Sequence, residues 1–198
     1  MSLISEAIRA ELARAYTAPD RHYHSLTHIE ALLSLAHQHQ GALADPDAVE
    51  AAIWFHDAVY DTRRHDNEEK SADLAVDRLK GATTQERLER IAEMIRATAS
   101  HQLPEFPSQE ARRDCALFLD LDLAVLGAAK EDYDSYAAAV RREYAWVPEP
   151  LWIEGRRKVL EKFLSRPTLY MSPQFRTSHE ELARRNIVQE LVMLTQAG

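Results

Sequence analysis

The chain contains little cysteine, little glycine and no long apolar segment. One cysteine among 198 residues excludes an internal disulfide and a cysteine-based zinc site, and it favours a reducing compartment. No apolar run approaches the roughly 20 residues that cross a bilayer, so we expect no membrane-spanning helix. Glu6 and Glu11 lie within an amphipathic pattern at the N-terminus, which is not typical of a signal peptide. We therefore expect a cytoplasmic protein.

The chain also lacks an excess of basic residues. It has 24 Lys and Arg residues against 32 Asp and Glu residues, for a formal net charge of −8. An acidic protein of this size binds nucleic-acid polymers and bilayers poorly, so we expect neither as a partner. This charge still allows a local basic pocket for one phosphate. A length of 198 residues with 45% hydrophobic content indicates a single domain over residues 1–198.

Alternating strand patterns are absent as well, and the chain has only five glycines. Apolar residues recur instead at helical spacing, which predicts an all-α bundle of eight or nine helices. Three helix starts carry Ser or Thr followed three residues later by Glu, the capping-box pattern, at Thr27, Thr83 and Ser178. The expected helices cover about residues 2–16, 27–40, 46–59, 68–80, 83–100, from 109 into the run at 117–127, and then 130–147, 150–164 and 178–198.

The pair His-Asp occurs twice, at residues 56–57 and 65–66, among nine histidines in all. His56 continues the apolar face of its helix, so we expect an inward imidazole with Asp57 beside it in a groove between helices. The alternative is a buried histidine that bonds a backbone carbonyl. His65 has no apolar periodicity around it, and Asp66 or Asn67 is well placed to cap the next helix. The first pair is therefore the candidate for chemistry.

The stretch RHYHSLTH, residues 21–28, holds three further histidines. His24 and His28 have the i, i+4 spacing of a zinc-chelating pair, but the expected helix start between them disfavours chelation by both. His28 is the better inward ligand because it adjoins the buried stripe. Arg21, Tyr23 and His24 would then line the mouth of a site, and a polar turn is the alternative.

Two aspartates, Asp120 and Asp122, interrupt the apolar run LFLDLDLAVLG at residues 117–127. Burying a lone carboxylate costs several kcal/mol unless it is paired or bound to a cation. A cation therefore explains at least one of them better than solvent does. Imidazole and carboxylate donors without thiolate suit a divalent ion such as Mn, Mg, Fe, Co, Ni or Zn.

These features together resemble the HD superfamily of metal-dependent phosphohydrolases, and in particular its bacterial group of predicted phosphohydrolases of about this length. The matching stretches keep their order and span nearly the whole chain: RHYHSLTHI, AAIWFHDAVYDTRRHDNEEKSA, FLDLDLAVLG, and EGRRKVLEKFL through ELARRNIVQEL. The resemblance implies that His28, His56, Asp57 and one late aspartate bind the metal. The setting of that aspartate in relatives favours Asp122, whereas the downstream leucine register fits Asp120 about as well.

The resemblance also implies a reaction, the hydrolysis of a phosphate ester of a nucleotide or another small phosphorylated metabolite by metal-activated water. Asp57 would accept the proton of the water, with Glu68 as the alternative base; Glu68 also suits a simple interaction with its helix dipole. Some relatives use further histidines for a second metal, and His101 is the candidate here. The candidates for contact with the substrate are Arg21, His24, Lys70, His101 and Arg156.

Other functions stay open at this point. A non-catalytic module could keep the metal as a structural pin or as part of a ligand sensor. An oxygenase of HD type would need two iron ions, and the few histidines between residues 66 and 120 disfavour it. The C-terminal helices could form a homodimer face, which their pattern does not distinguish from ordinary core.

Overall fold

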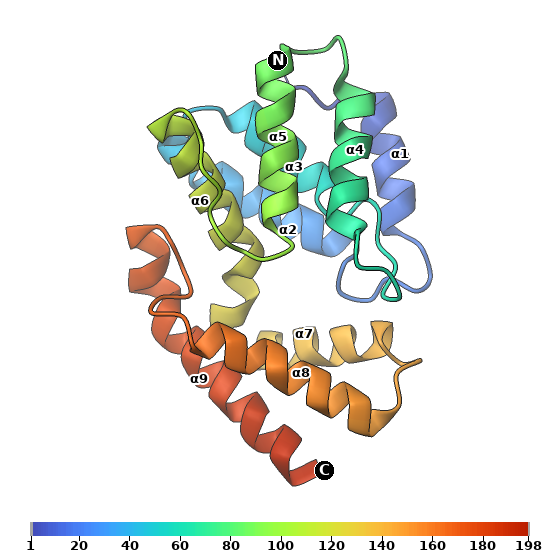
Figure 1. Ribbon diagram of the computed structural model, residues 1–198, viewed down its shortest axis with the longest axis vertical. Coiled ribbons are helices and arrows are strands. Elements are labelled where there is room, and N and C mark those ends of the chain that lie inside the picture. Colours follow the sequence, from blue (N-terminus) through green and yellow to red (C-terminus); the bar gives the residue numbers. More distant parts are fainter. Residues whose placement is uncertain (1, 198) are drawn as a thin grey trace. The chain divides into compact units, whose positions relative to one another are not determined.

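The computed structural model describes residues 2–197, and within them it is all-helical, as expected (Figure 1). The α-helices are α1 (Glu6–Tyr16), α2 (Leu26–Gln38), α3 (Pro46–Phe55), α4 (Asn67–Leu79), α5 (Gln85–Ala97), α6 (Gln109–Asp122), α7 (Lys130–Glu143), α8 (Glu149–Leu164) and α9 (Pro173–Ala197). Two short 3-10 helices are η1 (Gln40–Ala42) and η2 (Leu123–Gly127). None of the described helices is long and apolar enough to cross a membrane. The chain forms two compact units, Met1–Asp122 and Leu123–Gly198.

Helix α3 is the centre of the first unit. Seven of its residues are buried, among them Ile53 and Phe55, and it contacts α1, α2, α4, α5 and α6. A helix with this many buried apolar residues is stable only when other helices surround most of it. The residue that follows it, His56, is consequently carried into the interior of the unit, where 1% of it is exposed.

Carboxylates anchor the start of α3. The side chain of Asp45 accepts a hydrogen bond from the Ala48 backbone N–H at 3.1 Å and pairs with Arg87 of α5. Asp114 of α6 accepts hydrogen bonds from the backbone N–H groups of Ala44 and Asp45, at 2.8 and 2.9 Å. These contacts satisfy donors that a helix start leaves without partners, and they hold α3 against two neighbouring helices.

Two helices begin at residues other than the expected caps. Helix α2 begins at Leu26 with Ser25 in the N-cap position, so Thr27 lies inside the helix and the capping box predicted there is wrong. Thr84, and not Thr83, caps α5, and its side chain accepts a hydrogen bond from the Arg87 backbone N–H. A spacing of three residues between Thr and Glu also occurs within helices, so the pattern alone does not locate a start.

The expected start of the last helix, at Ser178, is also wrong. Helix α9 begins earlier, at Pro173, and the Ser178 hydroxyl donates to the carbonyl of Gln174 at 2.8 Å within the helix. Proline suits the first turn of a helix because the N–H that it lacks would have no partner there.

A buried ion pair joins the helices of the second unit. Arg156 of α8 donates two hydrogen bonds, of 2.7 and 3.0 Å, to the carboxylate of Glu190 of α9. The Tyr133 hydroxyl of α7 donates to the same carboxylate at 2.5 Å. Because each partner satisfies the others, these buried polar groups avoid the cost of lost hydration.

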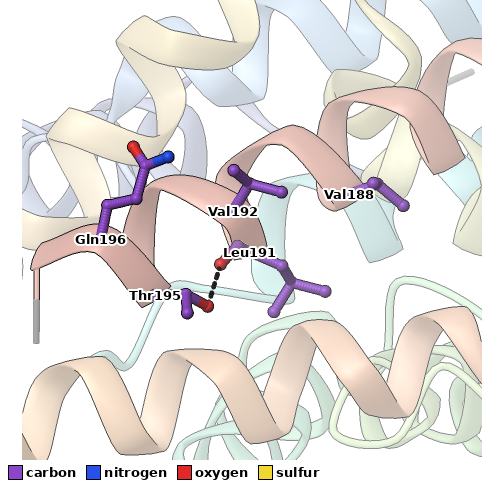
Figure 2. A pocket seen from close by; sticks show the side chains of 5 residues that line it. All are labelled: Val188, Leu191, Val192, Thr195 and Gln196. Carbon is purple, nitrogen blue, oxygen red and sulfur yellow. Dashed lines mark hydrogen bonds between the residues drawn. The ribbon is translucent and has the colours of Figure 1, made fainter.

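The second unit also carries the exposed large apolar side chains found among the described residues. They are Trp146, Leu151, Val159, Leu182, Val188, Val192 and Met193. Figure 2 shows Val188 and Val192 on α9, where they line a hollow together with Leu191, Thr195 and Gln196. The homodimer face expected from the sequence stays a prediction.

Candidate metal centre

Three side chains from three helices of the first unit meet at one point. His28 lies in the first turn of α2, His56 directly follows α3, and Asp122 is the last residue of α6. One ligand atom from each lies within 4.8 Å of the others, and both histidines are buried. The sequence predicted His28 and His56 together with one of Asp120 and Asp122, and the group found here could hold a metal ion.

The donor atoms have the spacing that one ion requires. Asp122 Oδ1 lies 3.2 Å from His28 Nε2 and 3.5 Å from His56 Nε2. Asp57 Oδ2 lies 2.9 Å from His56 Nε2 and 4.0 Å from His28 Nε2, so a fourth donor borders the same point. Ligands about 2.1 Å from an ion, at octahedral or tetrahedral angles, are about 3.0–3.4 Å apart. His28, His56 and Asp122 could therefore hold a single divalent ion, with the carboxylate of Asp57 beside them.

The imidazole of His56 is oriented as a metal ligand. Its Nδ1 lies 2.9 Å from the Ile53 carbonyl oxygen, which can only accept, so Nδ1 carries a proton. Its Nε2 is buried and has no hydrogen bond within the described residues, although Asp57 Oδ2 is in contact distance. The carboxylates of Asp57 and Asp122 both border this nitrogen, so a metal cation at this point would be stabilised by their charges.

The electrostatics of the site favour positive charge. Burial opposes a charge on His56, but the carboxylates of Asp57 and Asp122 outweigh it and raise the pKa of His56 well above its ordinary value. Burial also opposes ionisation of Asp122, but His56, His101 and His28 together hold the pKa of Asp122 well below its ordinary value. The pKa of Asp57 is lowered in the same way, because His56 outweighs the effect of burial. Both carboxylates are thus ionised at neutral pH and favour a proton or a metal cation beside them.

His101 holds the second oxygen of Asp122. Its Nε2 lies 2.9 Å from Asp122 Oδ2, whereas His28 and His56 lie near Asp122 Oδ1. The His101 backbone has φ 48°, in the left-handed region, and its N–H donates to the Ala97 carbonyl at 2.8 Å beyond the end of α5. Such a conformation costs a non-glycine residue about 1–3 kcal/mol and is often found at functional sites. We conclude that His101 orients Asp122; its expected roles with a second metal or with substrate stay predictions.

The structure distinguishes the two aspartates of LFLDLDLAVLG. Both lie in α6, and Asp120 is buried too, but Asp122 is the one whose oxygen lies within reach of His28 and His56. Residues two apart on a helix point about 200° away from each other, so both carboxylates cannot face the same point. The geometry therefore places Asp122, and not Asp120, in the group that could hold a metal ion.

The second His-Asp pair lies at a helix start, as predicted. Asp66 occupies the N-cap position of α4, but its side chain makes no capping bond. It accepts hydrogen bonds of 2.8 and 2.6 Å from Arg64 instead. The side chain of Asn67 holds the preceding turn through both the N–H and the carbonyl of Asp61.

A line of rings borders the candidate metal centre. Tyr23 packs against His28, with ring centroids 4.7 Å apart, and against His24 at 5.0 Å. His24 also packs against Tyr60, with ring centroids 4.3 Å apart. All three flanking rings are partly exposed. His24 therefore lies close to His28, and its expected contact with substrate stays a prediction. The sequence did not predict that Tyr60 borders the site. Its position three residues after Asp57 is the one signal that could have suggested it.

The alternative base and two of the expected substrate contacts lie in other surroundings. Glu68 lies in the first turn of α4, where its charge favours the helix dipole. Lys70 is exposed and pairs with Asp73 at 3.5 Å. Arg156 belongs to the second unit, where Glu190 binds its guanidinium. Roles for these side chains in catalysis or substrate binding stay predictions.

Comparison of the chain with family models, with curated proteins and with solved structures found no match. The chemistry of the site therefore has to be inferred from the side chains themselves. Two imidazoles and two carboxylates offer donors of mixed nitrogen and oxygen, which suit hard to borderline divalent ions.

Proposed function

We propose that this protein is a metal-dependent phosphohydrolase of HD type, acting on a phosphate ester of a nucleotide or another small phosphorylated metabolite. The observation that carries the proposal is the grouping of the buried Nε2 of His56 with His28 and Asp122, with the carboxylate of Asp57 beside them. The order of the matching motifs along the chain supports the same reaction class.

The charges of the site explain why a phosphohydrolase would need a cation here. Asp57 and Asp122 are both ionised at neutral pH, and two carboxylates repel a phosphate group. A bound divalent ion would reverse that repulsion, polarise a phosphoryl oxygen and lower the pKa of a water molecule. His28 and His56 would supply neutral donors, which leave the net charge of the ion available to the substrate.

The chain's own residues have distinct roles in the proposed reaction. Asp57 would orient the attacking water and accept its proton, with Glu68 as the alternative base. As the new P–O bond to the water oxygen forms, the P–O bond to the leaving alcohol breaks, and the alcohol oxygen takes up a proton. His101 would keep Asp122 in place through the contact at 2.9 Å.

One observation favours a second candidate, a non-catalytic module with a structural metal. The side chains of His28, His56 and Asp122 are only 5%, 1% and 12% exposed. Structural metal sites are closed, whereas catalytic sites keep a coordination position for water or substrate. Such a module would bind the same metal without turnover.

A metal and activity measurement distinguishes the two candidates. The protein is purified without chelator, loaded with each divalent ion in turn, and analysed for bound metal. Hydrolysis of p-nitrophenyl phosphate and of a nucleotide panel is then measured with and without EDTA. We expect about one equivalent of metal and EDTA-sensitive phosphate release. Bound metal without turnover supports the module, and no bound metal under any loading condition contradicts both candidates.

The two His-Asp pairs provide the matched variants. We expect His56→Ala to lose bound metal and activity, because it removes the ring nitrogen that lies beside both carboxylates of the site. His65→Ala changes an exposed histidine in the same stretch and should retain both. Equal loss in the two variants would contradict the assignment of the site to His56.

A further inference from the structure

Arg21 joins the two chain segments that carry three of the candidate ligands. Its Nη1 donates to the carbonyl of His24 at 3.0 Å and to the carbonyl of Asp57 at 2.7 Å. Its Nη2 donates to the carbonyl of Ala58 at 3.0 Å. One guanidinium therefore connects the segment before α2, which leads to His28, with the turn after α3.

These carbonyls belong to a part of the backbone that needs donors. Helix α3 ends at Phe55, and Asp57 and Ala58 lie in the turn beyond it. Carbonyls at and beyond a helix C-terminus lack the partners that the next helical turn would provide, and a cation there also interacts favourably with the helix dipole. Arg21 thus holds the turn on which the carboxylate of Asp57 is placed.

The guanidinium is itself held in position by aromatic rings. Its central carbon lies 4.9 Å from the ring centroid of Tyr16 and 5.4 Å from that of Tyr60. The hydroxyl of Tyr16, in turn, donates to the Trp54 carbonyl of α3 at 2.9 Å. Stacking on rings restricts the planar group to the orientation in which its donors meet the carbonyls.

We infer that Arg21 is a positioning residue of the candidate metal centre, which sets the distance between His28 and the pair His56–Asp57. The expectation from the sequence was a contact with substrate phosphate. Three of the five N–H donors of the guanidinium are instead directed to backbone carbonyls. The inference rests on the proposed function only where it concerns metal affinity, because the positioning itself is a property of the metal-free protein.

Arg21→Lys is the test variant, because it keeps the positive charge but cannot direct three donors in a fixed fork. Arg87→Lys is the matched control in the same unit. Arg87 also makes a forked contact, with Asp45 at the other end of α3, and its side chain is 26% exposed. Tyr60→Leu removes one of the rings that hold Arg21 and serves as a second test if Arg21→Lys fails to fold.

The first measurement is the NMR spectrum of the histidine ring nitrogens in the metal-free proteins. We expect the signals of His28 and His56 to shift or broaden in Arg21→Lys, to change in the same direction in Tyr60→Leu, and to stay unchanged in Arg87→Lys. Unchanged signals in both test variants would overturn the inference. This measurement does not depend on catalysis or on bound metal.

The second measurement is metal affinity, followed by the affinity for inorganic phosphate at saturating metal. Loss of groups that orient metal ligands typically weakens metal binding about 10- to 100-fold, which we expect for Arg21→Lys with phosphate affinity retained. Weaker phosphate binding with unchanged metal affinity would show that Arg21 contacts substrate and would overturn the inference. If the wild type binds metal without turnover, the proposed function fails while these measurements still test Arg21.

Discussion

Replacing Asp122 by asparagine tests the candidate metal centre most directly. Asp122 Oδ1 lies within 3.5 Å of both buried histidines, at 3.2 Å from His28 Nε2 and 3.5 Å from His56 Nε2, and asparagine removes the charge while it keeps the size of the side chain. A ligand that binds only the folded state stabilises it by RT ln(1 + [L]/Kd), which is about 2.7 kcal/mol when the ion is present at 100 times its Kd. For a chain of this size, the unfolding midpoint should then rise by about 5–11 °C.

The variant should lose nearly all of this metal-dependent stabilisation. Removing a group that merely orients a ligand weakens binding by up to about 100-fold, and removing a ligand should cost at least as much. At the same metal concentration, the ratio of ion to Kd then falls to about 1, and the stabilisation falls to about 0.4 kcal/mol. We therefore expect a shift of only about 1–2 °C for Asp122→Asn.

The assay is thermal unfolding, followed by circular dichroism, with and without the divalent ion. Asp114→Asn is the matched control, because Asp114 is another buried carboxylate of α6 but bonds backbone N–H groups at the start of α3. It should lower the midpoint of the metal-free protein and keep the full metal-dependent shift. An equal metal-dependent shift in Asp122→Asn and wild type would refute the role of Asp122 as a ligand.

Three further predictions concern stability. Burial opposes ionisation of Asp45, but two arginines of α5 outweigh it and lower the pKa of this carboxyl. The ionised Asp45 therefore stabilises the folded protein above its ordinary pKa of 3.8, and this stabilisation is lost as pH falls through the lower pKa of the folded state. In urea unfolding between about pH 2 and 7, the free energy of unfolding of Asp45→Asn should depend less on pH than that of the wild type. Glu190→Gln breaks the buried pair with Arg156 and should cost about 3–5 kcal/mol in urea unfolding, whereas a cost below about 1 kcal/mol would contradict the pairing. Gly127→Ala would place a Cβ 2.6 Å from the His179 Cβ and 2.8 Å from its carbonyl oxygen, so we expect a loss of about 1–3 kcal/mol and a correspondingly lower thermal midpoint.

The helices were predictable because their signal is local. Apolar residues at helical spacing identify an amphipathic helix from a few turns of chain, and α3 and α6 were located in this way. The same local pattern indicated that His56 continues an apolar face and that His65 does not. Helix starts were less predictable, since Thr27, Thr83 and Ser178 match the capping-box pattern but do not cap their helices.

The arrangement of the candidate site depends on contacts between distant segments. The rotation of α6 against its neighbours decides that Asp122, and not Asp120, faces the histidines. The left-handed backbone of His101 depends on how the chain leaves α5. The hydrogen bonds of the Arg21 guanidinium depend on where the turn after α3 places the carbonyls of Asp57 and Ala58.

The sequence by itself therefore determined an all-helical chain and the types of side chain that could bind a metal, because composition and periodicity are properties of short segments. Only the tertiary structure decided which of these side chains meet and which of them hold the others in place. The physical reason is that His28 and Asp122 meet across 94 positions of chain, through helix rotations that are fixed by the packing of several helices at once.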